Sequence, residues 1–180
     1  MTLDGDGSRR PRSPMLWTRT PPPPDPATLT LRRLLLASEG RRFPPEAVDF
    51  AAGLALPARV PVHVLSIARV WGTAFGFPNP NLYPSRQEWD AQRDLVESAL
   101  LALRARGLEA TGQVIGTRSA TRRIVAVARQ KGCDAIVMAA DPPRHWFVSD
   151  FIWSQEPYRV RRRARVPVYL VPAAEATLAL

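Results

Sequence analysis

Cysteine and lysine are almost absent from this sequence, and long apolar runs are missing. The single cysteine, Cys133, excludes a framework of internal disulfides and fits a reducing cytoplasm. It follows Gly132 and directly precedes an apolar stretch, so we interpret it as a buried structural thiol. No apolar run approaches the ~20 residues that a membrane-spanning helix requires, and no apolar signal core precedes the N-terminal prolines. These absences predict a cytoplasmic protein that is neither secreted nor inserted in a membrane.

The positive charge is carried almost entirely by arginine. The formal net charge is +9 at pH 7, and Lys131 is the only lysine. Abundant arginine, alanine and proline are typical of a high-GC genome, which weakens a functional interpretation of this charge. A basic balance permits nucleotides, nucleic acids or membrane surfaces as partners, but it selects none of them.

The length of 180 residues predicts one domain with tails at both ends. Residues 1–27 have little to bury and contain the stiff run Pro21–Pro24, so we expect a disordered tail. The domain is expected over residues 28–172, and residues 173–180 are expected to fray. The segment 71–85 is rich in glycine and proline, which excludes regular structure, and it is long for a simple connection.

Apolar periodicity predicts alternating strands and helices within the domain. The expected strands cover residues 29–38, 60–70, 109–115, 134–140 and 166–171, and the expected helices cover 46–56, 86–106, 122–131 and 159–165. Ser119 or Thr121 is expected to cap the third helix, and Trp89, Arg93 and Val96 are expected on one face of the second. Strands that alternate with helices, without hairpin signals, predict an α/β fold with a doubly wound parallel sheet.

Four stretches resemble the universal stress protein family in order and spacing. They read LLLASEGRRFPPEAVDFAAGLA, VHVLSIA, IVAVARQKGCDAIVMAA and RARVPVYLVPA, and they lie within residues 29–172. The resemblance implies a five-stranded sheet of order 3-2-1-4-5 with helices on both faces, of the adenine nucleotide alpha hydrolase-like type. It also implies a homodimer in which the last strands pair across a two-fold axis. An unpaired apolar edge strand independently favours such pairing.

The ATP-binding members of that family carry an aspartate in the first turn and three glycines after the fourth strand. Here Ser38 and Glu39 occupy the first turn, and Ala139, Pro142 and Ile152 fall on the glycine positions. Shifting the last position by one residue places Trp153 and Ser154 there instead. Proline has no N–H to offer a phosphate, and an indole would fill the space that phosphate occupies. The resemblance therefore implies the fold without the usual ATP site, and no cofactor is the first expectation.

An alternative is an anion site rebuilt from side chains. Arg144 and His145, together with the 71–85 segment, follow strand ends, where open α/β sheets bind ligands. Such a site would take ATP or AMP, with Mg²⁺, and would make the protein a nucleotide switch with at most slow ATP hydrolysis. The candidate cofactor-binding residues on this hypothesis are Ser38, Glu39, Ala139, Ala140, Arg144, His145 and Ser154.

Five arginines crowd the segment 159–165. They indicate either a surface for nucleic acid or the solvated face of the last helix, and the absence of aromatic-rich or helix-turn-helix signals favours the second interpretation. His63, His145 and Cys133 are too dispersed to predict a metal site. No nucleophile–base pair or phosphate-binding loop motif is present, so no catalytic residue is assigned. The resemblance therefore implies a stress-linked regulatory protein that acts through dimerisation and an unidentified protein partner.

Overall fold

Five parallel strands form one sheet in the order β3-β2-β1-β4-β5, as the sequence predicts. The computed structural model describes residues 22–69, 84–140 and 155–173. The strands are β1 (Leu34–Ser38), β2 (Val62–Arg69), β3 (Ala110–Thr117), β4 (Ala135–Ala140) and β5 (Val168–Pro172). The helices are a short 3-10 turn (Pro26–Thr28), α1 (Pro45–Ala55), α2 (Arg86–Ala105), α3 (Ala120–Gln130) and α4 (Glu156–Arg163).

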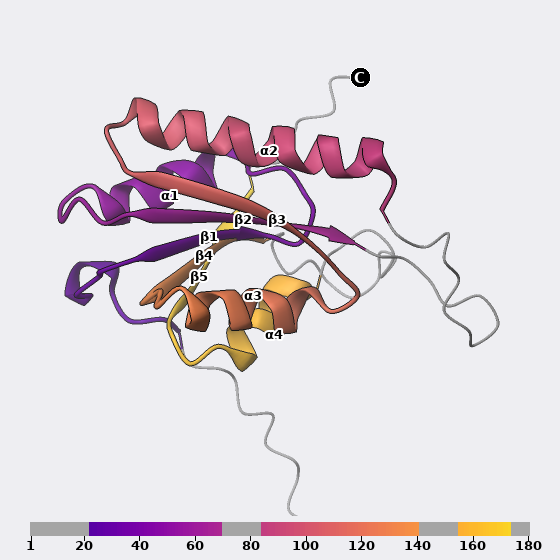
Figure 1. Cartoon of the computed structure of the whole chain (residues 1–180). Coiled ribbons are helices and arrows are strands. Elements are labelled where there is room, and N and C mark those ends of the chain that lie inside the picture. The colour runs from indigo at the N-terminus through magenta and orange to yellow at the C-terminus, as the bar shows by residue number, and fades with distance from the viewer. Residues whose placement is uncertain (1–21, 70–83, 141–154, 174–180) are drawn as a thin grey trace, which may run out of the picture.

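Helices cover both faces of the sheet (Figure 1). Successive side chains of a strand point to opposite faces, so the continuous apolar run of β1 serves two cores. Leu34 and Leu36 pack with α1 and α2 on one face, and Leu35 and Ala37 pack with α3 and α4 on the other. All five residues of β1 are buried. The central strand therefore holds the two halves of the domain together.

The first strand is shorter than its apolar run suggests. It begins at Leu34 instead of residue 29, because the backbone N–H groups of Arg32 and Arg33 donate to the Asp134 carboxylate at 2.7 and 3.0 Å. At these two residues the Asp134 carboxylate accepts the hydrogen bonds that a neighbouring strand would otherwise accept. The last helix begins at Glu156, three residues before the expected start at residue 159.

One residue on the inner face of α2 was predicted wrongly. Arg93 is exposed and pairs with Asp90, whereas Gln92 is half-buried beside the turn after β1. Both spacings, three and four residues before Val96, lie on one side of a helix, so periodicity alone does not separate them. Gln92 faces inward because its side-chain amide finds hydrogen-bond partners there, in Ser66 and the Gly40 carbonyl.

Pro24, which precedes the first strand, contacts Tyr169 of the last strand, β5. The Tyr169 hydroxyl donates to the backbone carbonyl of Pro24 at 2.9 Å, and its ring packs on Phe50 with centroids 5.5 Å apart. Pro24 thus contacts the domain, although the expected boundary falls at residue 28.

Candidate functional site

The carboxyl ends of β1 and β4 meet at the centre of the sheet. The chain leaves β1 toward α1 on one face, and the helix that follows β4, α4, lies on the other face. Ala37 of β1 lies opposite Met138 of β4, so Ser38 and Ala139 come next at the same edge. Ligands of open α/β sheets bind at such a reversal of strand order. This edge is therefore the first place to look for a site.

The turn after β1 is closed by its own hydrogen bonds. The Ser38 hydroxyl donates to the Arg41 carbonyl at 2.5 Å and accepts from the Gly40 N–H at 3.2 Å. Gly40 has φ = 110°, a backbone conformation that residues with a Cβ rarely adopt. The Glu39 carboxylate is buried, 2 % exposed, and accepts from Arg41 Nε at 2.7 Å. The acidic side chain of the first turn thus already has a cationic partner.

Two further polar side chains fasten this turn to the neighbouring strand and helix. The Ser66 hydroxyl, within β2 and opposite Ser38 of β1, donates to Gln92 Oε1 at 2.5 Å, and Gln92 Nε2 donates to the Gly40 carbonyl at 3.0 Å. The sequence interpretation missed Ser66, Gln92 and Arg41. A glutamine four residues before the apolar Val96 on a helix was the available signal for the second of these.

The end of β4 contributes only methyl groups among the described residues. Ala139 is half-buried and Ala140 is 4 % exposed, and neither side chain can donate or accept a hydrogen bond. The structure thus brings four predicted residues, Ser38, Glu39, Ala139 and Ala140, to one edge. Arg144, His145 and Ser154 lie outside the described residues, as does nearly all of the 71–85 segment.

The helices α3 and α4 are joined at their N-termini, close to the same edge. The Glu156 carboxylate accepts from the backbone N–H of Thr121 at 3.0 Å and from the Thr121 hydroxyl. Ser119, one of the two expected caps, occupies the N-cap position but makes no side-chain cap bond. A carboxylate from a distant helix caps α3 instead, and it also pairs with Arg159 at 3.1 Å.

The arginine-rich segment follows the solvated-face interpretation. Val160 is fully buried against the sheet, whereas Arg159, Arg162, Arg163 and Arg165 are exposed.

Cys133 is 5 % exposed, as expected for a structural thiol, and burial raises its pKa to about 11. Within the described ranges, no group of three or more histidine, cysteine, aspartate or glutamate side chains is placed to hold a metal ion.

His63 lies at the opposite, amino edge of the sheet. It is 5 % exposed, its Nδ1 is 2.9 Å from the Thr111 hydroxyl, and its Nε2 has no hydrogen-bond partner among the residues that the structure describes. Burial lowers the pKa of His63, and the nearby charges of Lys131 and Arg33 lower it further. Folding therefore favours the neutral form of this imidazole.

Replacing His63 by glutamine is expected to flatten the loss of stability between about pH 7 and pH 5. The unfolded chain takes up a proton near the ordinary histidine pKa, whereas the folded chain resists it, so stability falls as the pH drops. Urea unfolding followed by circular dichroism at several pH values measures this slope. An unchanged slope in His63→Gln would contradict the prediction.

The order of the strands and the placement of the helices define the class of protein. A five-stranded parallel sheet of order 3-2-1-4-5 with helices on both faces is the adenine nucleotide alpha hydrolase-like α/β fold. The sequence model of the Universal stress protein family matches residues 30–172. The chain belongs to this family.

Solved structures of the family share the fold at low sequence identity. A universal stress protein from Archaeoglobus fulgidus is 17 % identical, with a TM-score of 0.59 over 77 % of this chain and 92 % of that chain. A family member from Burkholderia pseudomallei is 22 % identical, with a TM-score of 0.58 over 79 % of this chain and 96 % of that chain. An Archaeoglobus fulgidus protein solved with dAMP is 17 % identical, with a TM-score of 0.57 over 77 % and 96 % of the two chains. No curated protein matches this chain significantly.

Helix length and composition also bear on membrane insertion. Among the helices that the structure describes, none is long and apolar enough to cross a bilayer.

Proposed function

We propose that this protein is a stress-response regulator that acts by dimerisation and by binding a protein partner, without the usual ATP site of its family. The observation that supports this most is the closed turn after β1. Glu39 is buried against Arg41, and the Ser38 hydroxyl is bonded to backbone groups of its own turn. A nucleotide would have to displace these internal partners, and polar groups that are already paired gain little from a new ligand. We place the protein in the cytoplasm, which its single cysteine fits.

Titration calorimetry with ATP, ADP and AMP in the presence of Mg²⁺ tests whether the protein lacks a nucleotide site. No heat above dilution is the result expected. Micromolar affinity that is lost in Arg144→Ala would overturn this part of the proposal. It would instead support the second candidate, a nucleotide switch with a site rebuilt from Arg144 and His145.

The nucleotide switch is retained because related folds hold nucleotides. One neighbour at 17 % identity was solved with dAMP, and a universal stress protein at 15 % identity was solved with cAMP. Ala139 and Ala140 leave the edge of β4 free of charged side chains, so phosphate binding would depend on residues beyond residue 140. Mg²⁺ would then reach the protein with the nucleotide.

Dimerisation is proposed through β5, which is an outer strand of the sheet. Its outward backbone groups have no strand partner among the described residues, and an apolar edge of this kind favours pairing with a second copy. Light scattering at micromolar concentration should give about twice the chain mass of 20.0 kDa. Leu170→Lys, which places a charge on the half-buried position of this edge, should give the monomer mass. A monomeric wild-type protein would overturn the proposal.

Nucleic-acid binding through Arg159–Arg165 is not the function proposed. Arg159 is engaged by Glu156, and the solvated-face arrangement explains the remaining exposure. Fluorescence anisotropy with labelled DNA and RNA at low salt should stay flat. A rise with a steep salt dependence would restore this function.

A further inference from the structure

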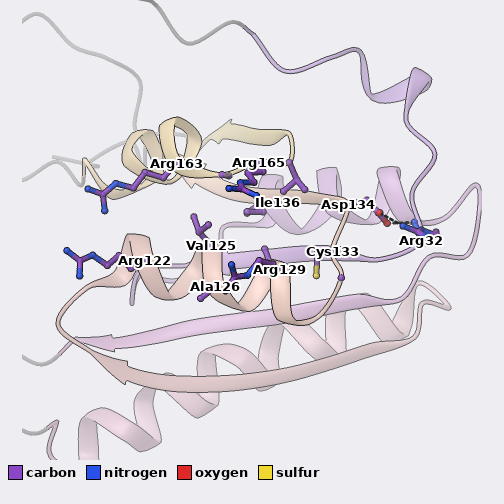
Figure 2. A pocket seen from close by; sticks show the side chains of 14 residues that line it. Arg32, Arg122, Val125, Ala126, Arg129, Cys133, Asp134, Ile136, Arg163 and Arg165 are labelled. Carbon is purple, nitrogen blue, oxygen red and sulfur yellow. Dashed lines mark hydrogen bonds and ion pairs between the residues drawn. The ribbon is translucent and has the colours of Figure 1, made fainter.

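A cavity of about 670 Å³ opens between α3 and the connection from α4 to β5 (Figure 2). Its floor and walls are apolar, with Ile136 of β4 at the base, Val125 of α3 on one wall, and Ala164 and Val166 on the other. Its volume lies within the range of small-molecule sites, which enclose about 300–1,000 Å³. The described residues of the predicted nucleotide site, Ser38, Glu39, Ala139 and Ala140, do not line this cavity.

Arginines from both walls form the rim of this cavity. Arg122 and Arg129 come from α3, and Arg163 and Arg165 come from the end of α4 and the segment after it. Arg122 and Arg163 extend toward the same end of the groove in Figure 2, and Arg129 and Arg165 stand on facing walls farther along. Within the described part of the chain, the guanidinium groups of these four residues have no hydrogen bond or ion pair.

The one carboxylate that lines the cavity does not compensate this charge. Asp134 accepts from the backbone N–H groups of Arg32 and Arg33 and pairs with the Arg32 side chain at 3.4 Å. Although partial burial alone would raise the pKa of Asp134, these hydrogen bonds and the charge of Arg32 hold it below its usual range. The dashed contacts in Figure 2 show that the aspartate is held at the far end of the groove by Arg32. Among the described residues, the four rim arginines therefore have no compensating carboxylate around the apolar floor.

We propose that this groove binds an amphipathic anion with a single alkyl chain and a carboxylate head, such as a free fatty acid. The alkyl chain would lie on the half-buried Val125, Ala164 and Val166, above the buried Ile136, where it displaces water from apolar surface. The carboxylate would accept charge-assisted hydrogen bonds from the rim, which arginine can supply in a bidentate manner. The volume of about 670 Å³ falls in the range of small-molecule sites, so we assign the groove to such a chain and not to a helix of a partner protein. This inference does not depend on the proposed function.

Calorimetric titration with octanoate, decanoate and dodecanoate, below their micelle concentrations, tests the apolar floor. Affinity should rise about fourfold for each added methylene group, the fold-change that corresponds to about 0.8 kcal/mol. Dodecyltrimethylammonium, which carries the same chain with a cationic head, should bind at least ~10-fold more weakly because it meets the same rim charge. Equal binding of the three carboxylates, or equal binding of the cation, would overturn the proposal.

Two double variants test the rim, namely Arg122→Gln with Arg163→Gln and Arg129→Gln with Arg165→Gln. All four positions are exposed, so both variants should fold. At least one pair should weaken dodecanoate binding ~10-fold or more. Arg86→Gln with Arg93→Gln is the matched control, because it removes the same charge from α2 on the other face of the sheet and should leave binding unchanged. Wild-type affinity in both rim variants would overturn the proposal.

A titration with an acidic amphipathic helical peptide tests the other occupant. Tight binding of this peptide without binding of dodecanoate would also overturn the proposal and would assign the groove to a protein partner.

Discussion

Replacing Gly112 by alanine is expected to lower the free energy of unfolding by about 1–3 kcal/mol, the usual cost of overpacking. Gly112 lies on β3 beneath α2, and a Cβ there would stand 2.5 Å from Val96 Cγ1 and 3.1 Å from Leu100 Cδ1. Valine is stiff at χ1, and Val96 is 6 % exposed, so it cannot rotate out of the way. The helix must move away from the strand. The strand preference for alanine over glycine is smaller than this cost. Urea unfolding measures the difference.

Gly53→Ala provides a control of opposite sign. Gly53 lies within α1, and an added Cβ would meet nothing within 4 Å, so the change should stabilise the protein by about 0.5–1 kcal/mol. A second control is the background Val96→Ala, in which the clash is removed. Gly112→Ala should cost less there by more than about 0.5 kcal/mol. An equal cost in both backgrounds would contradict the proposed contact with Val96.

Replacing Glu156 by alanine is expected to destabilise the protein by about 1.5–3 kcal/mol at pH 7, the contribution of hydrogen bonds to a charged group. The carboxylate is largely shielded, with 18 % of its side chain exposed, and it bonds both the N–H and the hydroxyl of Thr121. Its loss leaves the buried Thr121 without these acceptors and leaves the first turn of α3 uncapped. Because the bond joins α3 to α4, thermal unfolding should show an earlier transition.

The effect of Glu156→Ala should depend on pH with a defined sign. Burial alone raises the pKa of Glu156, but the hydrogen bonds from Thr121 and the charge of Arg159 outweigh it and lower the pKa below its usual value. A lowered pKa in the folded state contributes stability above the pKa of the unfolded chain, and this contribution is lost as the pH falls through the folded pKa. The difference between wild type and variant should therefore be full at pH 7 and shrink below about pH 4. A constant difference over this range would contradict the assigned bonds. Glu46→Ala, in the first turn of α1, is a matched control with a small expected effect.

The local pattern predicts most of the elements but not all of their ends. Continuous apolar runs mark β1 and β4 because a strand covered on both faces needs apolar residues at every position. The ends differ where a distant side chain intervenes. Asp134 stops the first strand at Leu34, and the pairing of Glu156 with Thr121 extends the last helix toward its N-terminus.

The candidate site was predictable only in part. Ser38, Glu39, Ala139 and Ala140 follow strands in the sequence, and the rule that parallel strands end at one edge brings them together. Ser38 and Glu39 were candidates for a ligand only on the alternative of a rebuilt site, and the structure adds that they bond to the backbone of the turn and to Arg41. The sequence does not reveal such a bond because residues two or three positions apart in a turn have no fixed periodicity.

The amino-acid sequence by itself determined the class of this protein. Its apolar periodicity and helix–strand alternation predict a doubly wound parallel sheet, because these signals are local and repeat along the chain. Its resemblance to universal stress proteins implies the strand order. Only the tertiary structure decided which polar groups are satisfied. Glu156 reaches Thr121 across 35 residues, Gln92 reaches Gly40 across 52, and the arginine-rimmed groove forms where α3 meets the segment after α4. Such contacts depend on the packing of separate elements, and no local pattern encodes them.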